Sequence, residues 1–540
     1  DPLRDLIARH ARTHGPFTTH ALALRFGLGV SVADAALDRL RAQGKLLKGN
    51  FGVERRLEAQ DETTPPPNPL ATHEWVADDV FKRLRLRALH AARAATRPAG
   101  QDAYTRLLLE RHALATAPAG QHPLAGIDGV ARIIEQLAGV PLPAALWENQ
   151  ILRARIADYT PAMLDELLSH GTVLWCGHAT PGNEDGLVSL HPSDFAAETL
   201  PPPPDADRMA ALSPLQRAIL AILADGGAYF ARQLAALAPA RLAAEPDSDW
   251  ASNPILTASE LDTALWDLAW TGHVTTDSWS PLRARSGARA THRPRPVQRS
   301  RRHRGLHGAA FARPSGAPTL SGRWSLLPRE AVTDTARALT LAECLLDRYG
   351  IVTRGATIAE AVPGGFPALQ PIFRSMEDAG QILRGRFVEG LGATQFAERA
   401  TIDRLRAHAE RPTTAPRAIA LSAADPANPF GTVLPWPPHP STTRPTRRPG
   451  AFVVIAGDRL AFYLTQGGRT LLTYLDPDDP AHTDRLTTAL SALAAALKRE
   501  KHLMFTLETV NDHPVQTTSL DAALRAHGFS MMPKGLGWHP

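Results

Sequence analysis

The sequence predicts a mainly α-helical protein with α/β parts, built from tandem winged-helix modules and a small β-barrel-like unit near the C-terminus. Three features support this prediction: the length, a recurring order of helices closed by glycine, and a late change to strand-type patterning. The 540 residues exceed what one hydrophobic core can hold, and 46 prolines indicate linkers between folded units. We therefore expect several small modules.

The first module shows the recurring order most simply. Helical spacing of apolar residues begins at Leu3, and the breaker His14-Gly15-Pro16 separates it from two further short helices, Thr18–Leu28 and Val32–Leu40. Gly44 ends the last helix before a β-like run. Three short helices followed by a glycine and a strand are the order of a helix-turn-helix with a wing.

The same order returns three times along the chain. From the breaking to the closing glycine the spacing is 29, 32, 45 and 30 residues, in the intervals Gly15–Gly44, Gly139–Gly171, Gly227–Gly272 and Gly350–Gly380. The longer third interval holds an insertion rich in proline and alanine around residues 238–256. Self-similarity at such a period marks tandem modules.

The pattern turns toward strands after Arg406. Ala451–Ile455, the turn Gly457-Asp458, Leu460–Leu464 and Thr470–Tyr474 predict a meander of at least three strands, followed by a helix at Leu486–Arg499. Together these signals predict winged helices at 1–60, 121–200, 205–282 and 331–400, a helical linker at 61–120, an Arg/Pro-rich linker at 283–330, a β-barrel-like unit at 401–480 and an α/β tail at 481–540. Four winged helices are clear, and the tail could complete a fifth.

Composition limits the other classes of protein. The two cysteines, Cys176 and Cys344, lack the paired spacing of a zinc site or a disulfide framework, which favours a reducing compartment. No apolar stretch is long enough to span a membrane, so a cytoplasmic location is the expectation. The chain begins with Asp1 rather than Met, which is typical of a fragment or a processed product. A net charge of +5 is modest for this length.

Several motifs resemble one known family. The run Arg384-Gly385-Arg386-Phe387-Val388-Glu389-Gly390-Leu391-Gly392, the run Ala424-Asp425-Pro426-Ala427-Asn428-Pro429-Phe430-Gly431 and the segment Gly322-Arg323-Trp324-Ser325-Leu326 resemble the C-terminal region of the bacterial large helicase-related (Lhr) proteins. The first module, from His14 to Gly29, resembles that region too. The resemblance implies an ATP-dependent 3′-to-5′ DNA helicase of DNA repair, whose motor precedes this region, and a region of winged helices and a β-barrel that assembles into homo-oligomers.

The motor itself is not visible in the sequence. No Gly-x-x-x-x-Gly-Lys-Ser/Thr motif occurs, and Gly44-Lys45 is followed by Leu46, which offers no hydroxyl to a magnesium ion. ATP and Mg²⁺ are therefore implied only for the missing motor, and no cofactor is expected in this chain.

The expected partner is DNA, either single-stranded or a duplex with a single-stranded tail. The last helix of a winged helix commonly enters the major groove, which makes the nearby cations candidates for phosphate or base contacts. In the first and fourth modules these are Arg39, Arg41, Lys45, Arg374, Arg384 and Arg386. The second module, with Asp165 and Glu166 on its last helix, is poorly suited to DNA. The alternative is that these cations are merely solvated.

The strongest electrostatic feature is the segment from Arg283 to Arg304, which holds nine arginines and no acid. Guanidinium groups match phosphate geometry, so the segment is interpreted as a phosphate-binding strap; the alternative is a solubilising linker. The candidates for DNA contact here are Arg299, Arg301, Arg302 and Arg304.

Catalytic and metal signals are weak. His10 and His14 are four residues apart without a third ligand, so no metal site is predicted. Because winged helices joined to a barrel are also similar to a group of bacterial DNA glycosylases, removal of uracil or of an alkylated base is an alternative function. Its weak candidates are Asp425, Gln395 and Gln466. A protein scaffold without a nucleic-acid role is the remaining alternative.

Overall fold

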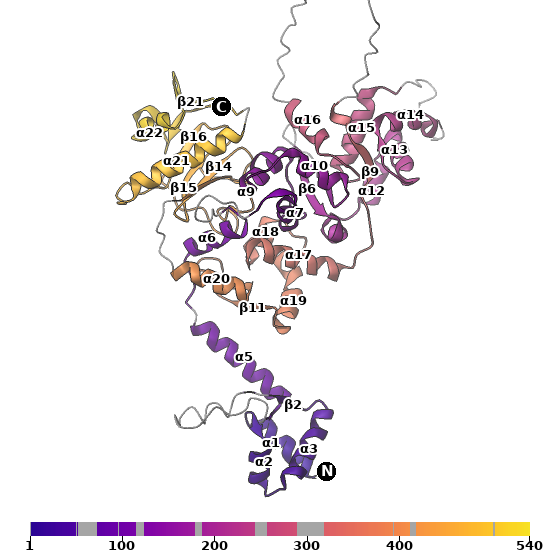
Figure 1. Ribbon diagram of the computed structural model, residues 1–540, viewed down its shortest axis with the longest axis vertical. Helices are drawn as coiled ribbons and strands as arrows, with labels where there is room; N and C mark the ends of the chain where they lie inside the picture. Colours follow the sequence, from indigo (N-terminus) through magenta and orange to yellow (C-terminus); the bar gives the residue numbers. More distant parts are fainter. Residues whose placement is uncertain are drawn as a thin grey trace, which may run out of the picture. The chain divides into compact units, whose positions relative to one another are not determined.

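The computed structural model describes residues 2–49, 51, 73–95 (backbone only for 89–95), 97–114, 124–178, 186–243, 256–288, 318–392, 394–410, 417–500 and 503–539. The chain divides into two compact units, Asp1–Arg97 (unit 1) and Pro98–Pro540 (unit 2). Figure 1 labels the elements of both units.

Unit 1 consists of short helices and a small antiparallel sheet. Its elements are α1 (Pro2–Thr13), β1 (Phe17–Thr18), α2 (Thr19–Phe26), α3 (Val30–Ala42), β2 (Leu46–Gly49), β3 (Glu74–Ala77) and the long helix α5 (Asp78–Ala95). The strand order is β1-β3-β2, so the last strand in the chain lies in the centre of the sheet. That central strand comes from beyond residue 60.

Local sequence explains the helices of unit 1. The Thr18 hydroxyl accepts a hydrogen bond from the backbone of Ala21 and caps α2, and Gly27 ends that helix in the left-handed conformation at φ 63°. Helix α3 buries an apolar stripe at helical spacing. The core closes on Trp75 of β3, which is fully buried and donates to the Thr19 hydroxyl over 2.9 Å.

Unit 2 begins with two parts that repeat this order. The first contains α6 (Gln101–Arg111), α7 (Gly126–Gln136), β4 (Leu142–Pro143), α8 (Ala144–Leu146), a π-helix (Trp147–Leu152), α9 (Arg153–Arg155), α10 (Pro161–Ser169), β5 (Val173–Gly177), β6 (Leu187–Pro192), a 3₁₀ turn (Ser193–Phe195) and α11 (Ala196–Thr199). The second contains α12 (Ala206–Ala210), α13 (Pro214–Ala224), β7 (Tyr229–Phe230), α14 (Ala231–Leu242), α15 (Ala258–Trp270), β8 (Val274–Thr276), α16 (Ser280–Ala288), a 3₁₀ turn (Pro318–Leu320) and β9 (Arg323–Leu326).

The remainder of unit 2 starts with a third such part and ends in a larger sheet. The third part contains α17 (Asp334–Tyr349), β10 (Ile351–Val352), α18 (Arg354–Ala359), α19 (Gly365–Asp378), β11 (Ile382–Gly385), β12 (Gln395–Glu398) and α20 (Arg399–Glu410). The final elements are β13 (Ala418–Ser422), β14 (Phe452–Ala456), β15 (Arg459–Leu464), β16 (Thr470–Thr473), α21 (His482–Arg499), β17 (Phe505–Leu507), β18 (Thr509–Val510), β19 (His513–Pro514), a 3₁₀ turn (Val515–Thr517), α22 (Leu520–Ala526), β20 (Ser530–Met532) and β21 (Gly535–Trp538).

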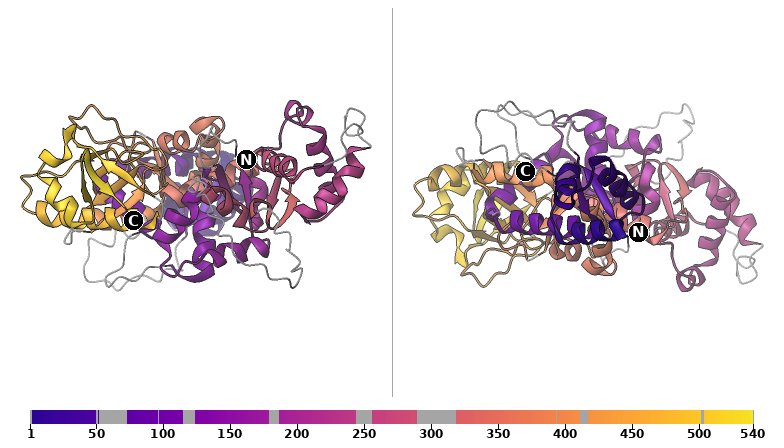
Figure 2. Two further views of the ribbon diagram at one scale, coloured as in Figure 1. Left: turned by 90° about the horizontal axis from the view of Figure 1, so that it is seen from above. Right: turned by 90° about the horizontal axis from the view of Figure 1, so that it is seen from below.

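Five small sheets share one strand order. They are β1-β3-β2, β4-β6-β5, β7-β9-β8, β10-β12-β11 and β17-β21-β20, and in each the last strand along the chain pairs with both others. Within unit 2, the sheet of β7–β9 and the elements around α21 lie at opposite ends in both views of Figure 2. The same strand order therefore recurs from the first to the last sheet of the chain.

The predicted β-barrel is wrong. Strands β13-β14-β15-β16-β18-β19 form an open sheet of six strands, in which β16 pairs with β18 in parallel and β18 turns into β19. Side chains of β14 and β15 alternate between two cores: Phe452 and Val454 pack with α21, whereas Val453 and Ile455 pack with the third repeated part. Because other elements cover both faces, the sheet buries its apolar residues without closing on itself.

Arginine side chains connect the parts of unit 2. Arg348 of α17 is 1% exposed and donates to the carbonyls of Gln136 and Ala138 at the end of α7, over 3.0 and 2.9 Å. Arg111 of α6 binds the carbonyls of Leu346 and Asp347 at the end of α17 in the same manner. The last carbonyls of a helix have no partner within the helix, so these arginines satisfy them while holding neighbouring helices together.

No single helix among the described residues is long and apolar enough to cross a membrane; α2 and α3, bent by 116°, pass such a test only as a pair and only by length and composition.

Two histidines of unit 2 are buried in the neutral form. Burial lowers the pKa of His112 to about 3, with Arg155 adding to the effect, and burial likewise lowers the pKa of His191 to about 3. His112 Nε2 lies 3.0 Å from the carbonyl oxygen of Arg348, which only a protonated nitrogen can bind, so Nε2 donates. The imidazole therefore serves as a neutral hydrogen-bond donor inside the core.

These pKa values predict acid sensitivity. The folded-state pKa lies below the unfolded one, so the unfolded chain takes up the proton first and stability falls as the pH drops from about 6.5 toward 3. When the pH is lowered from 6.5 to 5, each of these two histidines should reduce the free energy of unfolding by about 2 kcal/mol. We expect His112→Gln, whose amide can still donate to the Arg348 carbonyl, to lose less stability on acidification in thermal unfolding.

The matched control is His170→Gln at an exposed position. On acidification this control should lose as much stability as the unaltered chain. If His112→Gln loses equally much, the assignment of a buried neutral imidazole is contradicted.

Candidate nucleic-acid interface

The positive charge of the chain is concentrated in unit 1. Residues 1–97 contain 16 lysines and arginines and 11 acids, whereas the remaining residues contain 43 of each. The entire excess of +5 therefore lies in the first 97 residues. A positively charged module on an otherwise balanced chain is the electrostatic feature expected of a nucleic-acid contact.

The sequence-predicted cations of unit 1 lie at one end of α3. Arg39 and Arg41 are exposed in its last turn, where a helix favours positive charge, and Lys45 is exposed in the turn that leads to β2. Among the described residues neither arginine has an ion-pair partner. The three side chains are thus accessible. They lie at the C-terminal end of α3, however, whereas the first turns of a recognition helix are the ones that enter the groove.

The preceding turns of α3 have a different character. Val30 and Val32 are each 50% exposed, and Asp38 is exposed next to Lys48, whose Nζ lies 3.9 Å from its carboxylate. Asp34 accepts a hydrogen bond from the Thr19 hydroxyl. The exposed side of the first turns therefore offers apolar and acidic groups and no cation.

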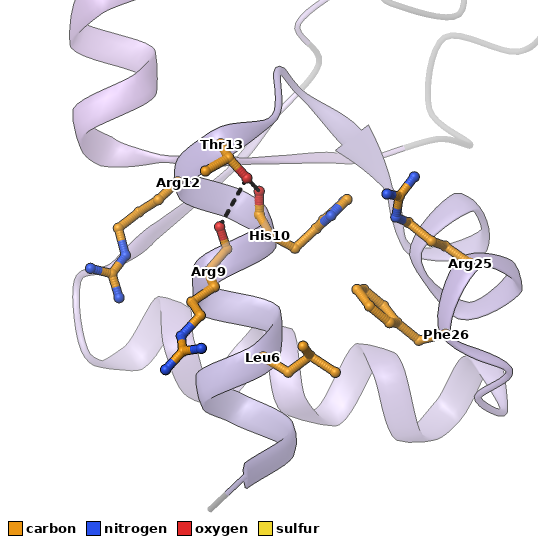
Figure 3. Close-up of a pocket in the computed structure, with 7 residues that line it drawn as sticks. All are labelled: Leu6, Arg9, His10, Arg12, Thr13, Arg25 and Phe26. Atoms are coloured by element: carbon orange, nitrogen blue, oxygen red, sulfur yellow. Dashed lines mark hydrogen bonds between the residues drawn. The ribbon is translucent and has the colours of Figure 1, made fainter.

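A pocket of about 460 Å³ lies between α1 and α2 (Figure 3). Helix α1 buries Ile7 and Ala11 in the core, which turns its neighbouring side toward α2. The lining residues are Leu6, Arg9, His10, Arg12, Thr13, Arg25 and Phe26, with three arginines and no acid. Figure 3 shows Leu6 and Phe26 facing each other, with Arg9 and Arg12 on the α1 side and Arg25 on the α2 side.

His10 fixes the inner wall of this pocket. Its ring stacks on His14 at 3.8 Å and meets the edges of Phe17 and Phe26. Burial, and then the proximity of His14 and Arg25, lower the pKa of His10 below its usual range. At neutral pH the ring is uncharged and forms a flat, mainly apolar surface between the arginines. No group of three metal ligands occurs among the described residues.

Cations on α5 extend the positive surface of unit 1. Lys82 pairs with Asp78 at 2.8 Å, Arg83 donates to the carbonyl of Asp79, and the side chains of Arg85 and Arg87 are exposed. Sequence reasoning noted these residues only as part of a helical linker. The sequence-based interpretation placed the contact on the third helix and did not include the α1–α2 pocket, although the spacing of Leu6, His10 and Thr13 puts them on one helical face.

The cations predicted in the third repeated part of unit 2 are scattered. Arg374 on α19 and Arg386 after β11 are exposed without an ion-pair partner in the described part of the chain, whereas Arg384 lies 3.5 Å from Glu377. The structure does not bring these three into a pocket.

The arginine run is partly structural. Arg299, Arg301, Arg302 and Arg304 lie outside the described residues, but Arg283 and Arg285 lie on α16. Arg283 binds Glu148 at 2.7 Å and Asp165 at 2.6 Å, and the guanidinium of Arg285 lies 4.6 Å from the centre of the Trp266 ring. Arg285 also lies 3.7 Å from the Asp262 carboxylate. Although the segment from Arg283 to Arg304 contains no acid, acids distant in the sequence therefore pair with its first two arginines.

Two of the three catalytic candidates are held in structural contacts. The Gln395 amide accepts from the backbone of Phe387 and Val388 and donates to the carbonyls of Val388 and Gly392, which fixes the loop after β11. Gln466 is exposed in the turn between β15 and β16.

Asp425 forms a buried ion pair with Arg155. The two side chains are 1% and 0% exposed, and the guanidinium donates twice to the carboxylate over 2.7 and 3.0 Å. Burial alone would raise the pKa of Asp425, but Arg155 outweighs this effect and the pKa lies below its usual value. The Ala427 backbone donates to the same carboxylate over 2.8 Å. The carboxylate is charged, saturated with donors and shielded from water, so it is not free to position a water molecule.

Two family models match this sequence. Both describe a winged-helix domain of large helicase-related proteins, and they match residues 99–193 and 331–417, which cover the first repeated part of unit 2 up to β6 and the whole third part.

Two relatives align along nearly the whole chain. An Escherichia coli protein named Lhr helicase/uracil glycosylase is 47% identical over 552 residues, which cover 99% of this chain and 34% of that protein. A Mycolicibacterium smegmatis protein named Lhr helicase/probable uracil glycosylase is 40% identical over 555 residues, with the same coverage of each. The chain thus spans about a third of the length of these relatives.

A solved structure is distantly similar. The Streptomyces sahachiroi DNA glycosylase AlkZ aligns with a TM-score of 0.43 and 16% identity over 75% of this chain and 97% of that chain. A likeness at this level supports no functional inference.

The geometry of Asp425 predicts a loss of stability on substitution. Asp425→Asn keeps an acceptor for Ala427 but leaves the buried Arg155 without an opposite charge, which should cost about 3–5 kcal/mol of unfolding free energy. Removing the orphaned charge as well, in Arg155→Met with Asp425→Asn, should recover much of that loss. Chemical denaturation of the full chain measures both.

Gln466→Ala, in an exposed turn, is the control and should unfold like the unaltered chain. An Asp425→Asn chain of unchanged stability would show that the ion pair is not a structural requirement.

Proposed function

Because this chain belongs to the large helicase-related (Lhr) protein family, we propose that it is a DNA-binding region built of winged-helix modules. The observation that carries the proposal is the location of the whole positive excess in unit 1, a unit with the strand order of the two family-matched winged-helix domains. Phosphate contacts supply most of the affinity of such modules for DNA.

The number of modules is part of the proposal. The sheets β1-β3-β2, β7-β9-β8 and β17-β21-β20 have the same order as the sheets of the two matched domains, and each is preceded or flanked by short helices. We interpret all five as winged helices. Four strands of the six-stranded sheet, β13 to β16, precede the strands of the fifth module, and its last two strands, β18 and β19, lie between β17 and β20 of that module. The two faces of the sheet pack against the cores of the fourth and the fifth modules.

The modules have unequal tasks in this interpretation. In the second module the Asp165 carboxylate of α10 is engaged, since it binds Arg283 and the backbone of Trp279 over 2.8 Å, whereas Glu166 is exposed. Cations of unit 2 largely bind carbonyls and carboxylates of unit 2, as Arg348 and Arg155 do. Unit 2 serves chiefly as a rigid scaffold, and unit 1 supplies charge for DNA.

Helicase activity is proposed for the longer family proteins and not for this chain. The relatives are named helicases, and the matched region is 34% of their length. ATP hydrolysis and its Mg²⁺ ion are assigned to other parts of such proteins, because this sequence has no phosphate-binding loop. The expected homo-oligomer and the preference for single-stranded or tailed DNA stay predictions.

DNA binding is tested by titrating the full chain with a labelled single-stranded oligonucleotide at several salt concentrations. The logarithm of the affinity should fall linearly with the logarithm of the salt concentration, by about 0.7 for each engaged phosphate contact. Three or more engaged cations predict a slope of about 2 or steeper. A chain that binds no DNA at low salt, or binds it without salt dependence, would contradict the proposal.

DNA glycosylase activity is a second candidate, favoured by the names of both relatives, which include uracil glycosylase. The chain should then produce abasic sites in a uracil-containing single strand and none in the matched thymine strand. Gln466→Ala is the informative variant, since Gln466 is the exposed candidate and Asp425→Asn is expected to impair folding. The absence of abasic product from the uracil strand would eliminate this candidate.

A further inference from the structure

We propose that unit 1 binds one unpaired nucleotide of a single-stranded nucleic acid in the pocket between α1 and α2, with its phosphates at Arg9, Arg12 and Arg25 and its base against Leu6 and Phe26. This inference rests on the proposed DNA-binding function and specifies the surface and the strand type. It replaces the sequence-based expectation that the third helix makes the main contact.

Helix α3 is a poor groove reader. Groove entry brings the first turns of the recognition helix to the base edges, where arginine, lysine, asparagine and glutamine read the sequence. Here those turns expose Val30 and Val32, and Asp38 follows on the exposed side. An exposed carboxylate beside a phosphate backbone is repulsive. Arg39 and Arg41 come only in the last turn of α3.

The α1–α2 pocket has the opposite electrostatic character. Three of its seven lining residues are arginines and none is an acid. Among the described residues, none of these three arginines contacts a carboxylate; the Arg12 Nε donates only to the carbonyl of Ala8, over 3.4 Å. Their planar guanidinium groups are therefore free for the paired hydrogen bonds that arginine forms with phosphate.

A neighbouring pocket contains acids as well as cations, unlike the α1–α2 pocket. On another side of Arg12 a second pocket of about 400 Å³ includes Lys45 but also Asp78 and Asp79. The two acids cancel much of the local positive potential there. A phosphate near Arg12 is consequently drawn to the α1–α2 side.

The apolar part of the pocket selects an unpaired strand. Leu6 is 45% exposed and faces Phe26, with Arg25 on the same side of α1, whereas the side chains of Arg9 and Arg12 extend on the other side of that helix (Figure 3). The uncharged His10 ring, in edge contact with Phe26, continues this surface. A duplex presents phosphates and sugars along its outside, whereas a single strand can place a base on an aromatic face. The hollow of about 460 Å³ is open to solvent, which leaves room for a base that is still attached to its strand.

The test compares equal losses of charge on two helices of the full chain. One variant is Arg9→Gln with Arg25→Gln, and its matched control is Arg39→Gln with Arg41→Gln; all four side chains are exposed, so both variants should fold, which circular dichroism checks. Fluorescence anisotropy measures binding of labelled oligothymidylate and of a blunt duplex of equal length.

We expect the Arg9/Arg25 variant to lose about tenfold or more in affinity for oligothymidylate, with a salt slope reduced by about 1.4 for two lost contacts. The Arg39/Arg41 variant should lose less than about threefold. Phe26→Leu, which keeps the apolar volume and removes the aromatic face, should weaken binding of oligothymidylate more than binding of the duplex.

Two failures are distinguishable. If the unaltered chain binds neither probe, the proposed DNA-binding function fails and the pocket assignment with it. If the unaltered chain binds but the Arg39/Arg41 variant loses as much as the Arg9/Arg25 variant or more, the DNA-binding function stands and the pocket assignment is overturned. Preference of the unaltered chain for the duplex over the single strand would likewise overturn it.

Discussion

The organisation of unit 2 depends on the buried ion pair between Arg155 and Asp425. These residues are 270 positions apart, both are almost inaccessible to water, and each supplies the other with its main partner. A buried charge without a partner is strongly unfavourable, so the first repeated part and the segment between β13 and β14 of the six-stranded sheet must assemble together. The nearby Arg447 side chain strengthens this segment, because it donates to the carbonyl of Asp425 over 2.9 Å and to that of Phe430 over 3.2 Å.

The arginines of the two units differ in the same respect, namely in whether they have partners within the protein. Several guanidinium groups of unit 2 are structural connectors, at helix ends as with Arg348 and Arg111, or in ion pairs as with Arg155 and Arg283. Such groups are unavailable to a polyanion. In unit 1, Arg9, Arg12 and Arg25 surround a pocket without an opposing acid. The proposed division between a scaffold and a DNA contact therefore rests on what these arginines already bind as well as on the net charge of each unit.

Local features of the fold could be predicted from the sequence. The four closing glycines, Gly44, Gly171, Gly272 and Gly380, all have positive φ values, from 70° to 79°, because ending a helix in the left-handed conformation is a local requirement. The strands at Phe452–Ala456 and Arg459–Leu464 were equally visible. Features that depend on distant partners were not. The central strands β3 and β9 each follow a long segment after the strand they pair with, and their short sequences carry no sign of which sheet they join.

The same distinction applies to the candidate site. Sequence could identify Arg39, Arg41 and Lys45 as accessible cations, but it could not show that Asp425 and Gln395 are saturated by donors and acceptors from elsewhere in the fold. The predicted barrel was wrong for a related reason. The pattern of apolar residues within the strands predicts a sheet, but it does not show that other elements cover both faces of that sheet and leave it open. The α1–α2 pocket required the relative placement of two helices, which the winged-helix core of unit 1 determines.

Hydrogen–deuterium exchange of the full chain with and without a single-stranded oligonucleotide tests the central claim most directly, because it maps the contact without altering any residue. The account predicts that DNA slows exchange in peptides covering α1 and α2, residues 2–26, with smaller effects in α3 and in unit 2. Protection confined to unit 2, or centred on the first turns of α3, would contradict it.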